Sequence, residues 1–439
     1  MQFGTDGVRG VALSELTTEF ATKLGRAAAR VLGADGAGIV VVGGDTREST
    51  ALLDQALCDG FAAEGLDVIR LGVASTPQVA FEAQRRGAIG AVVSASHNPW
   101  TDNGIKLFAR GGVKLADETE RRIEAELATL VSDSPSTPGS IVDVSADHDA
   151  YIGHVVAFLE GLRLDGLRVV LDAANGAAHQ IGPQVLRSAG AEVIVIAASP
   201  TGRNINDGCG ATAPSLVAAA VLEHGADVGI ALDGDADRLI AVDHTGKVVD
   251  GDHIIAIAAN DLRARGELRN DTVVVTVMTN LGFRLAMEEA GIEVVETAVG
   301  DRYVLEALAA GGHSLGGEQS GHVIFADHAT TGDGVLTAVA LLDALKRAGR
   351  PLADIAADTM TSLPQVLVNV RVAERMPDVA ALLADEIAAA ELELGVTGRV
   401  LVRASGTEPL VRVMVEAPTH DQAQHVADTL ANAARHVAA

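Results

Sequence analysis

Short runs of β-branched residues alternate with helix-periodic segments three times along this chain. The first unit has an apolar run at residues 39–42, a helical pattern at 49–64 and a second apolar run at 68–71. Apolar residues that recur every three to four positions indicate an amphipathic helix, and short runs of Val and Ile indicate buried strands. Strands that alternate with helices predict an α/β fold of mixed, mainly parallel sheets with helices on both faces.

The same order of elements returns twice, although no sequence repeat accompanies it. The second unit has strands at 168–171, 192–196 and 227–232 and helical patterns at 184–188 and 214–224. The third has strands at 272–278 and 292–297 and helical patterns at 281–290 and 302–310. We therefore expect three α/β domains of similar topology.

The order of elements changes near residue 364. A strand at 366–372, a helix near 378–392, two strands flanking 403–409 and a closing helix from residue 422 follow. This order predicts a smaller C-terminal α+β domain. At roughly 150 residues per domain, a chain of 439 residues is long enough for three or four domains.

Charge and cysteine content exclude several classes of protein. The chain has 33 Lys and Arg against 59 Asp and Glu, and its formal net charge is −26. Such a chain repels nucleic acid and anionic membranes, so an anionic substrate would need a locally basic pocket. The two cysteines show no CxxC spacing, and the polar N-terminus lacks an apolar signal region. We expect a cytoplasmic protein without membrane spans.

Each α/β unit ends in a polar loop that contains glycine or proline. These loops are SASHNP at 94–99, DGDADR at 233–238 and GEQSGH at 317–322. Ligands of open α/β sheets bind at the carboxyl ends of the strands, so we expect the three loops to face one cleft.

The DGDADR loop carries three carboxylates at alternate positions, Asp233, Asp235 and Asp237, directly after an apolar strand. An EF-hand loop would have Gly and Glu at the positions of Arg238 and His244, so a calcium sensor is disfavoured. Mg²⁺ prefers few carboxylates together with water or phosphate oxygens, and this favours a site for phosphoryl groups. A solvated acidic turn is the alternative for this loop by itself.

The segment RASGTEPLVR offers groups that bind a phosphate monoester. Arg403 and Arg412 supply guanidinium forks, Ser405 and Thr407 supply hydroxyls, and Gly406 permits a nest of backbone N–H groups. A hairpin with surface arginines would have the same pattern.

The remaining motifs carry sugar-binding groups and isolated cations. Glu318 and Ser320 of GEQSGH can form hydrogen bonds with vicinal sugar hydroxyls, while Arg9, Lys106 and Arg302 lie in glycine-rich or strand-end motifs. The sequence contains no GxxxxGK[ST], and no GxGxxG follows a strand. A P-loop kinase and a Rossmann dehydrogenase are therefore both disfavoured.

Taken in order, GTDGVRG, SASHNP, DNGIK, DGDADR, GDRY, GEQSGH and RASGTEP resemble the motifs of the α-D-phosphohexomutase family. The resemblance runs from residue 3 to about residue 412. It implies an isomerase with three similar α/β domains and a smaller fourth domain around a central cleft. The implied division is a phosphoserine domain at 1–150, a metal-binding domain at 151–249, a sugar-binding domain at 250–363 and a phosphate-binding domain at 364–439.

The resemblance also implies the chemistry of the first two loops. Ser96 corresponds to the serine that carries a phosphoryl group, and its phosphate would bind Mg²⁺ together with Asp233, Asp235 and Asp237. Ala236 departs from the family pattern, in which glycine is common at this position. We expect the additional methyl group to leave the metal site intact.

The implied reaction passes through a hexose 1,6-bisphosphate, which also acts as activator. Lys106 and His97 are the candidates for proton handling or charge stabilisation, and Arg9 and Arg238 for holding the transferring group. The substrate-binding residues would be Arg302, Glu318 and Ser320 for the sugar side, and Arg403, Ser405, Gly406, Thr407 and Arg412 for the distant phosphate.

The motif variants point to one substrate within the family. By resemblance, GTDGVRG and GEQSGH favour glucosamine 6-phosphate, since other members of the family more often carry YDIRG and GEMSGH. This substrate would place the reaction on the route to UDP-N-acetylglucosamine and cell-wall precursors. The alternatives are a phosphoglucomutase or phosphomannomutase, a Mg²⁺-dependent sugar phosphatase, and a sugar-phosphate-binding protein without catalysis. A phosphosugar is then the only partner expected, with no nucleic acid and no membrane; a homodimer is left open.

Overall fold

The computed structural model describes residues 3–4, 6–34, 36, 38–130, 137–144, 148–374, 376–404 and 409–437. The chain forms two compact units. The first unit comprises Met1–Met278 and Ile292–Ala357, and the second comprises Thr279–Gly291 and Asp358–Ala439. The helix α9 (Leu281–Ala290) is therefore part of the second unit, although the strands before and after it belong to the first.

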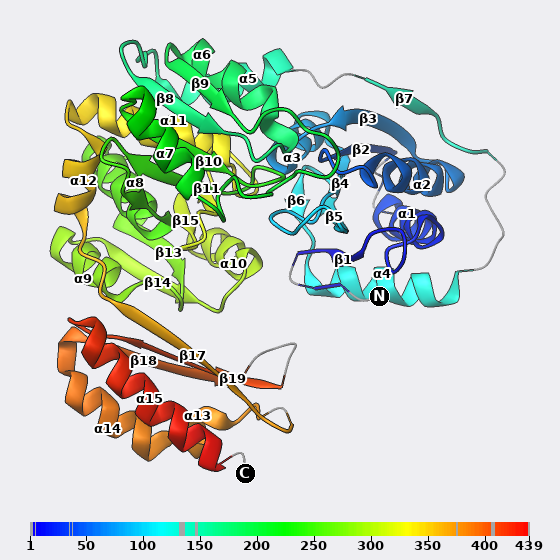
Figure 1. Ribbon diagram of the computed structural model, residues 1–439. Coiled ribbons are helices and arrows are strands. Elements are labelled where there is room, and N and C mark those ends of the chain that lie inside the picture. Colours follow the sequence, from blue (N-terminus) through cyan, green and yellow to red (C-terminus); the bar gives the residue numbers. More distant parts are fainter. Residues whose placement is uncertain are drawn as a thin grey trace. The chain divides into compact units, whose positions relative to one another are not determined.

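The first sheet lies in the N-terminal part of the first unit, drawn in blue to cyan in Figure 1. Its strand order is β1-β5-β4-β2-β3-β7, with β6 beside β5. The strands are β1 (Val8–Val11), β2 (Ile39–Gly44), β3 (Asp67–Val73), β4 (Ile89–Val93), β5 (Asp102–Ala109), β6 (Val113–Lys114) and β7 (Ile141–Asp143). The helices are α1 (Thr18–Gly33), α2 (Thr50–Ala63), α3 (Thr76–Arg86) and α4 (Asp117–Thr129).

The apolar run of strand β2 is continuous because both faces of the strand are buried. Val40 and Val42 are buried in a cluster with residues of α1, α2 and α4, whereas Val41 is buried on the other side with residues of α3. Both faces of the strand are covered, so each position requires an apolar side chain.

Two further sheets complete the first unit, with the orders β12-β11-β10-β8-β9 and β14-β13-β15-β16. The strands are β8 (Arg168–Asp172), β9 (Glu192–Ile196), β10 (Val228–Leu232), β11 (Leu239–Asp243), β12 (Val248–Val249), β13 (Thr272–Thr276), β14 (Glu293–Thr297), β15 (Leu315–Gly317) and β16 (Val323–Phe325). The α-helices around them are α5 (His148–Val156), α6 (Ile181–Ala189), α7 (Ser215–His224), α8 (Gly251–Arg265), α10 (Asp301–Gly311), α11 (Gly334–Ala348) and α12 (Leu352–Thr359). Short 3₁₀ turns lie at η1 (Ala157–Leu159), η2 (Ala177–His179) and η3 (Arg269–Asp271).

The three sheets share one topology, which confirms the prediction of three similar α/β domains. In each, the first strand pairs in parallel with the second on one side and with the third on the other, and the fourth strand runs antiparallel beside the third. These sets are β2-β3-β4-β5, β8-β9-β10-β11 and β13-β14-β15-β16. The connection between the third and fourth strands therefore occupies the same place in all three domains.

Helix α11 joins the second and third α/β domains. Every residue from Gly334 to Leu345 is buried, and the helix contacts α6, α8 and β10. Apart from Thr337 and Asp343, its buried side chains are apolar, as expected for a helix in the interior. The carboxylate of Asp333 caps its first turn by accepting from the N–H groups of Val335 and Leu336.

The second unit contains a three-stranded antiparallel sheet in the order β17-β19-β18, drawn in orange to red in Figure 1. Its elements are β17 (Gln365–Arg371), α13 (Val379–Leu382), α14 (Ala384–Leu394), η4 (Gly395–Thr397), β18 (Arg399–Ala404), β19 (Leu410–Glu416) and α15 (His420–Val437). The smaller α+β domain predicted from the sequence is thus confirmed. The one helix expected near 378–392 is divided at Leu383, whose side chain is buried in the core of the unit.

Across the part of the chain that the structure describes, no helix combines the length and the apolar character needed to cross a membrane.

Candidate active site

The connections between the third and fourth strands of the α/β domains carry the motifs singled out in the sequence. Residues 94–101 join β4 to β5, residues 233–238 join β10 to β11, and residues 318–322 join β15 to β16. A hydrogen bond joins the first loop to the second. His322 Nδ1 of the third loop lies 3.7 Å from Asp237 Oδ1 of the second. The three loops therefore meet, as expected for the carboxyl ends of parallel strands.

Ser96 lies three residues beyond β4 and is almost completely buried. Its φ angle of 53° is in the left-handed region, which residues with a β-carbon rarely adopt. The Ser96 N–H donates to Ser94 Oγ at 3.0 Å, and the Ser96 hydroxyl donates to Asp233 Oδ2 at 2.5 Å. The turn after β4 thus directs the hydroxyl into the acidic loop of the second domain.

The carboxylates of Asp233, Asp235 and Asp237 converge on one point. Each contributes an oxygen that lies within 4.8 Å of the others, and all three side chains are buried. They follow β10, whose five residues are all buried, so the strand anchors the loop. Burial, together with the neighbouring charges of Asp237 and Asp235, raises the pKa of Asp233 well above its ordinary value. Such a cluster is relieved by a cation.

The oxygen atoms of this cluster fit a divalent metal ion. Oδ1 of Asp235 and Oδ1 of Asp237 are buried and have no hydrogen-bond partner among the described residues. Buried oxygens without partners are costly, and a hard cation with oxygen ligands satisfies them. Mg²⁺ binds through a few carboxylates completed by water or phosphate oxygens. The donor set therefore suits Mg²⁺, with the Ser96 oxygen beside it.

Lys106 balances part of the negative charge of the cluster. Its Nζ lies 2.8 Å from Asp235 Oδ2 and 2.9 Å from both Asp237 Oδ2 and Asp6 Oδ2. Burial opposes a charged ammonium, but the carboxylates of Asp235, Asp237 and Asp6 prevail and raise the pKa of Lys106 well above its usual value. Burial likewise opposes ionisation of Asp237, but Lys106 overcomes it and lowers the pKa of Asp237.

Arg238, His97 and Arg9 lie in the same site. Arg238 Nη1 is 3.1 Å from His97 Nδ1, and the Arg238 N–H donates to Asp233 Oδ1 at 3.2 Å. Burial and the charges of Arg238 and Arg9 lower the pKa of His97 to about 4, so its imidazole is neutral at neutral pH. Arg9 donates to Asp6 Oδ2 at 2.6 Å.

Glu318 and Ser320 lie on the third loop. Glu318 is half-buried, and its Oε1 accepts from the N–H of Gly300, the residue before α10, at 3.1 Å. Ser320 is exposed. The loop therefore offers one carboxylate held by the backbone and one hydroxyl open to solvent.

Ion pairs connect α4 of the first domain with α10 of the third. Arg302, a predicted sugar-binding residue, is paired with Asp117 and Glu120, and its Nη2 lies 2.6 Å from Glu120 Oε1. Lys114 is paired with Asp301 beside it. In this arrangement the Arg302 guanidinium bridges two domains.

The predicted phosphate-binding residues belong to the second unit. Arg403 on β18 lies directly opposite Arg412 on β19. Burial and the Arg412 charge lower the pKa of Arg403. Two cations at one register position repel each other, so an anion between them would be favourable. Ser405, Gly406 and Thr407 lie outside the described residues.

Three residues at the site had no role assigned from the sequence. Thr76, at the start of α3, donates its hydroxyl to Asp235 Oδ2 at 2.6 Å. Asp6 contacts Lys106 and Arg9, as described above. His322 faces Asp237, and although burial opposes it, Asp237 raises the pKa of His322. Asp6 and His322 lie inside quoted motifs, which would have indicated them, whereas no motif marks Thr76.

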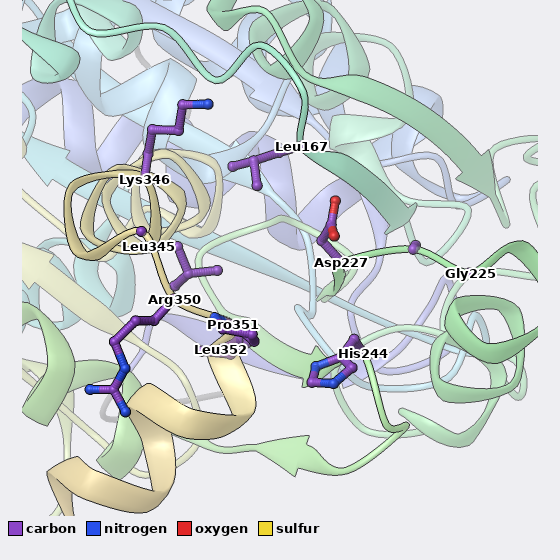
Figure 2. Close-up of a pocket in the computed structure, with 11 residues that line it drawn as sticks. Leu167, Gly225, Asp227, His244, Leu345, Lys346, Arg350, Pro351 and Leu352 are labelled. Carbon is purple, nitrogen blue, oxygen red and sulfur yellow. The ribbon is translucent and has the colours of Figure 1, made fainter.

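A cavity of about 560 Å³ lies away from these motifs (Figure 2). It is lined by Leu167, Asp227 and His244 and by residues between 345 and 352. Leu167 and Asp227 precede β8 and β10, whereas Asp233 follows β10. The cavity therefore lies at the amino ends of these strands, at the opposite edge of the sheet from the motif loops.

Comparison with known families gives matches along nearly the whole chain. Models of four domain families match in succession: phosphoglucomutase/phosphomannomutase alpha/beta/alpha domain I at residues 1–133, domain II at 149–246, domain III at 250–363 and the C-terminal domain at 367–433.

Curated relatives and solved structures agree with this result. Proteins named phosphoglucosamine mutase from Streptomyces coelicolor and Frankia casuarinae are 54% and 55% identical, each alignment covering 99% of this chain and 98% of the relative. A phosphoglucomutase/phosphomannomutase family protein from Burkholderia thailandensis has a TM-score of 0.84 at 25% identity, over 99% of this chain and 98% of its own. The N-acetylphosphoglucosamine mutase of Aspergillus fumigatus, in complex with GlcNAc-6P and magnesium, shares the fold with a TM-score of 0.73 at 20% identity, over 100% of this chain and 96% of its own.

Proposed function

This chain belongs to the phosphoglucomutase/phosphomannomutase family, and we propose that it is an isomerase that interconverts glucosamine 6-phosphate and glucosamine 1-phosphate. More than half of its residues are identical to those of relatives named phosphoglucosamine mutase. The observation that carries the proposal is the 2.5 Å contact between Ser96 Oγ and Asp233, which places a nucleophile against a metal-binding cluster.

In the proposed reaction the resting enzyme carries a phosphoryl group on Ser96. The sugar O1 of glucosamine 6-phosphate attacks the phosphorus, the P–Oγ bond breaks, and the O1 proton passes to a base. The resulting 1,6-bisphosphate turns over in the site. Ser96 Oγ then attacks the 6-phosphate, the O6–P bond breaks, and O6 takes up a proton. The product is glucosamine 1-phosphate, and the phosphoserine is regenerated.

The buried charges support this transfer. Asp233, Asp235 and Asp237, together with a phosphoserine oxygen, would hold Mg²⁺, which when bound neutralises charge on the transferring group. Lys106 and His97 are proposed to handle the proton or to stabilise charge, and Arg9 and Arg238 to hold the transferring phosphoryl group. A trace of hexose 1,6-bisphosphate would phosphorylate enzyme molecules that have lost the group.

The other motifs are proposed to bind the remainder of the substrate. Each proposed domain contributes one motif loop, with boundaries at 1–150, 151–249, 250–363 and 364–439. The residues that would bind the sugar are Arg302, Glu318 and Ser320, and those that would bind the distant phosphate are Arg403, Ser405, Gly406, Thr407 and Arg412. The register pairing of Arg403 with Arg412 supports the phosphate assignment.

Substrate choice is expected to be partial. The C2 amine of glucosamine 6-phosphate is largely protonated near neutral pH, and an acidic site favours it. Neutral 2-hydroxy sugars lose one charged contact worth roughly 1.5–3 kcal/mol, or about one to two orders of magnitude in kcat/KM. We expect glucosamine 6-phosphate to react fastest, glucose 6-phosphate more slowly and mannose 6-phosphate most slowly.

A coupled assay on these three hexose 6-phosphates, with Mg²⁺ and a trace of bisphosphate, tests the proposal. Intact-mass analysis should show a phosphorylated fraction that is lost in Ser96→Ala, and this variant should be inactive. Ser140→Ala is a matched control, because the exposed Ser140 hydroxyl donates to Asp67 Oδ1 at 2.6 Å and contacts none of the proposed site residues. Faster turnover of glucose or mannose phosphate would contradict the substrate assignment, and release of inorganic phosphate would indicate a phosphatase.

A further inference from the structure

Two side chains outside the motifs bind the backbone on both sides of His97. Arg47 Nη2 donates to the carbonyl of Ser96 at 3.1 Å and to that of Asn98 at 2.5 Å. Asn206 Nδ2 donates to the same two carbonyls, at 2.9 Å and 3.2 Å. Two donors from distant parts of the sequence therefore hold one short stretch of loop.

The Arg47 side chain lies in the protein interior. Its side chain is completely buried and forms an ion pair with the equally buried Asp45. The Arg47 N–H also donates to Asp45 Oδ1 at 3.0 Å, and Nη1 lies 3.5 Å from Ser94 Oγ, the atom that accepts from the Ser96 N–H. A planar guanidinium with this many fixed partners restrains the loop in one conformation.

Asn206 reaches the same carbonyls from the second α/β domain, from the segment between β9 and α7. Its N–H donates to the carbonyl of Ala174 at 2.9 Å, which fixes its own backbone. The approach is close: a β-carbon at Gly234 would lie 2.6 Å from the Ser96 carbonyl oxygen and 2.9 Å from Asn206 Nδ2. Gly234 in the acidic loop thus leaves room for this contact.

Arg47 and Asn206 bind the loop at a residue whose backbone conformation is unfavourable. Ser96 has a φ of 53°, which is unfavourable for a residue with a β-carbon and persists only where the surroundings determine it. Rotation of this backbone would carry Oγ away from Asp233. Phosphoryl transfer requires the attacking and leaving oxygens to lie in line, and small displacements of reacting atoms cause large losses in rate.

We propose that Arg47 and Asn206 are positioning residues that hold the Ser96 backbone in its left-handed conformation during both phosphoryl transfers. The inference rests on the proposed function, because it assigns these residues to the transfer step of that reaction. Neither side chain touches the substrate in this scheme, so substrate affinity is independent of them. Their loss slows the transfer itself.

The test compares Arg47→Lys and Asn206→Ala with two controls. Arg70→Lys alters an arginine paired with Asp54 in the same domain, and Asn204→Ala alters an asparagine two positions away in the same loop. For Arg47→Lys and Asn206→Ala we expect kcat with glucosamine 6-phosphate to fall about 10- to 100-fold while KM stays within about twofold. The controls should keep both constants within about twofold.

Single-turnover transfer from pre-phosphorylated enzyme provides the second measurement, and it should slow by the same factor as kcat. If Arg47→Lys does not fold, the less buried Asn206→Ala decides alone, after its folding is checked by circular dichroism. Wild-type kcat in a folded Asn206→Ala variant would overturn the inference, as would an equal loss in the controls. A wild-type enzyme without mutase activity would instead overturn the proposed function, and the inference with it.

Discussion

Ala236 has an unfavourable backbone conformation at the centre of the acidic loop. Its φ is 58°, its N–H donates to the carbonyl of Asp233 at 3.1 Å, and its carbonyl accepts from the N–H of Gly334 at 3.0 Å. The residue is completely buried. The two hydrogen bonds hold it in the left-handed region, where glycine has no steric penalty. Ala236 therefore destabilises the fold through its backbone conformation, which the sequence by itself does not show.

Ala236→Gly should stabilise the protein. Removal of the β-carbon relieves the steric cost of the left-handed conformation, and we expect a gain of about 1 kcal/mol, which would appear as a higher midpoint of thermal unfolding. Ala219→Gly is the matched control, because Ala219 is exposed on helix α7 and glycine there should cost about 1 kcal/mol. A lower midpoint for Ala236→Gly would show that the methyl group contributes more by packing than it costs in strain.

We predict that the loop from 233 to 238 depends on a cation. Its three buried carboxylates repel each other and would repel a phosphoserine, so removal of the metal should abolish activity. We expect EDTA to inactivate the enzyme and excess Mg²⁺ to restore it. Asp235→Asn should raise the Mg²⁺ concentration needed for half-maximal activity by about 10-fold or more. Undiminished turnover in excess EDTA would refute the metal assignment.

The arginines on the facing strands β18 and β19 should contribute to substrate binding rather than to the phosphoryl-transfer step. Arg403 and Arg412 are proposed to contact the phosphate that does not react, in both the ground state and the transition state. Their replacement by alanine should raise KM about 10-fold or more and change kcat by only a few-fold. Arg435→Ala on α15 is the control from the same unit. A fall in kcat with unchanged KM would place the arginines beside the transferring group instead.

The repeated elements could be predicted from the sequence because their signals are local. Buried strands and amphipathic helices are visible over a few residues, and the polar loops at strand ends follow from the topology. Several contacts within the site could not be predicted from the sequence. Thr76, Arg47 and Asn206 lie in segments without a distinctive motif, and only the meeting of separate loops gives them their partners. Such contacts are properties of the fold and leave no pattern in the local sequence.

The assignment of α9 also depends on distant contacts. Its sequence predicts a helix in the third α/β domain, and the helix forms where expected. Its first turn, however, is bound by the second unit: the N–H of Leu281 donates to Glu416 Oε2 at 2.9 Å, and Asn280 Oδ1 accepts from the N–H of Leu363. These partners are more than 80 positions away, so no window along the sequence could indicate them.

The two cysteines can report the unfolding of separate domains. Cys58 is buried in α2 of the first domain, and Cys209 is buried near the second sheet. Burial raises the pKa of Cys209 to about 11 and that of Cys58 still further, so little thiolate is present at pH 8. We expect DTNB to label the native protein at least 100-fold more slowly than the urea-unfolded chain.

The rate of DTNB labelling of the native protein should rise with pH. An ordinary thiol is fully ionised above about pH 9.5, whereas labelling of native Cys209 should continue to accelerate up to about pH 11. Cys58→Ala and Cys209→Ala would assign each phase, since each leaves one thiol. Rapid labelling of the native protein at pH 8 would contradict the burial of the thiol concerned.

The second unit is assembled from two separate stretches, Thr279–Gly291 and Asp358–Ala439. During synthesis α9 leaves the ribosome roughly ten seconds before Glu416 is added, at rates of about 5–20 residues per second. In that interval Asn280 and Leu281 lack Leu363 and Glu416, which bind the first turn of α9 in the finished protein, and the segment is available to chaperones. A nascent chain stopped after residue 357 should therefore be cut by protease within Thr279–Gly291, a segment that the complete chain protects.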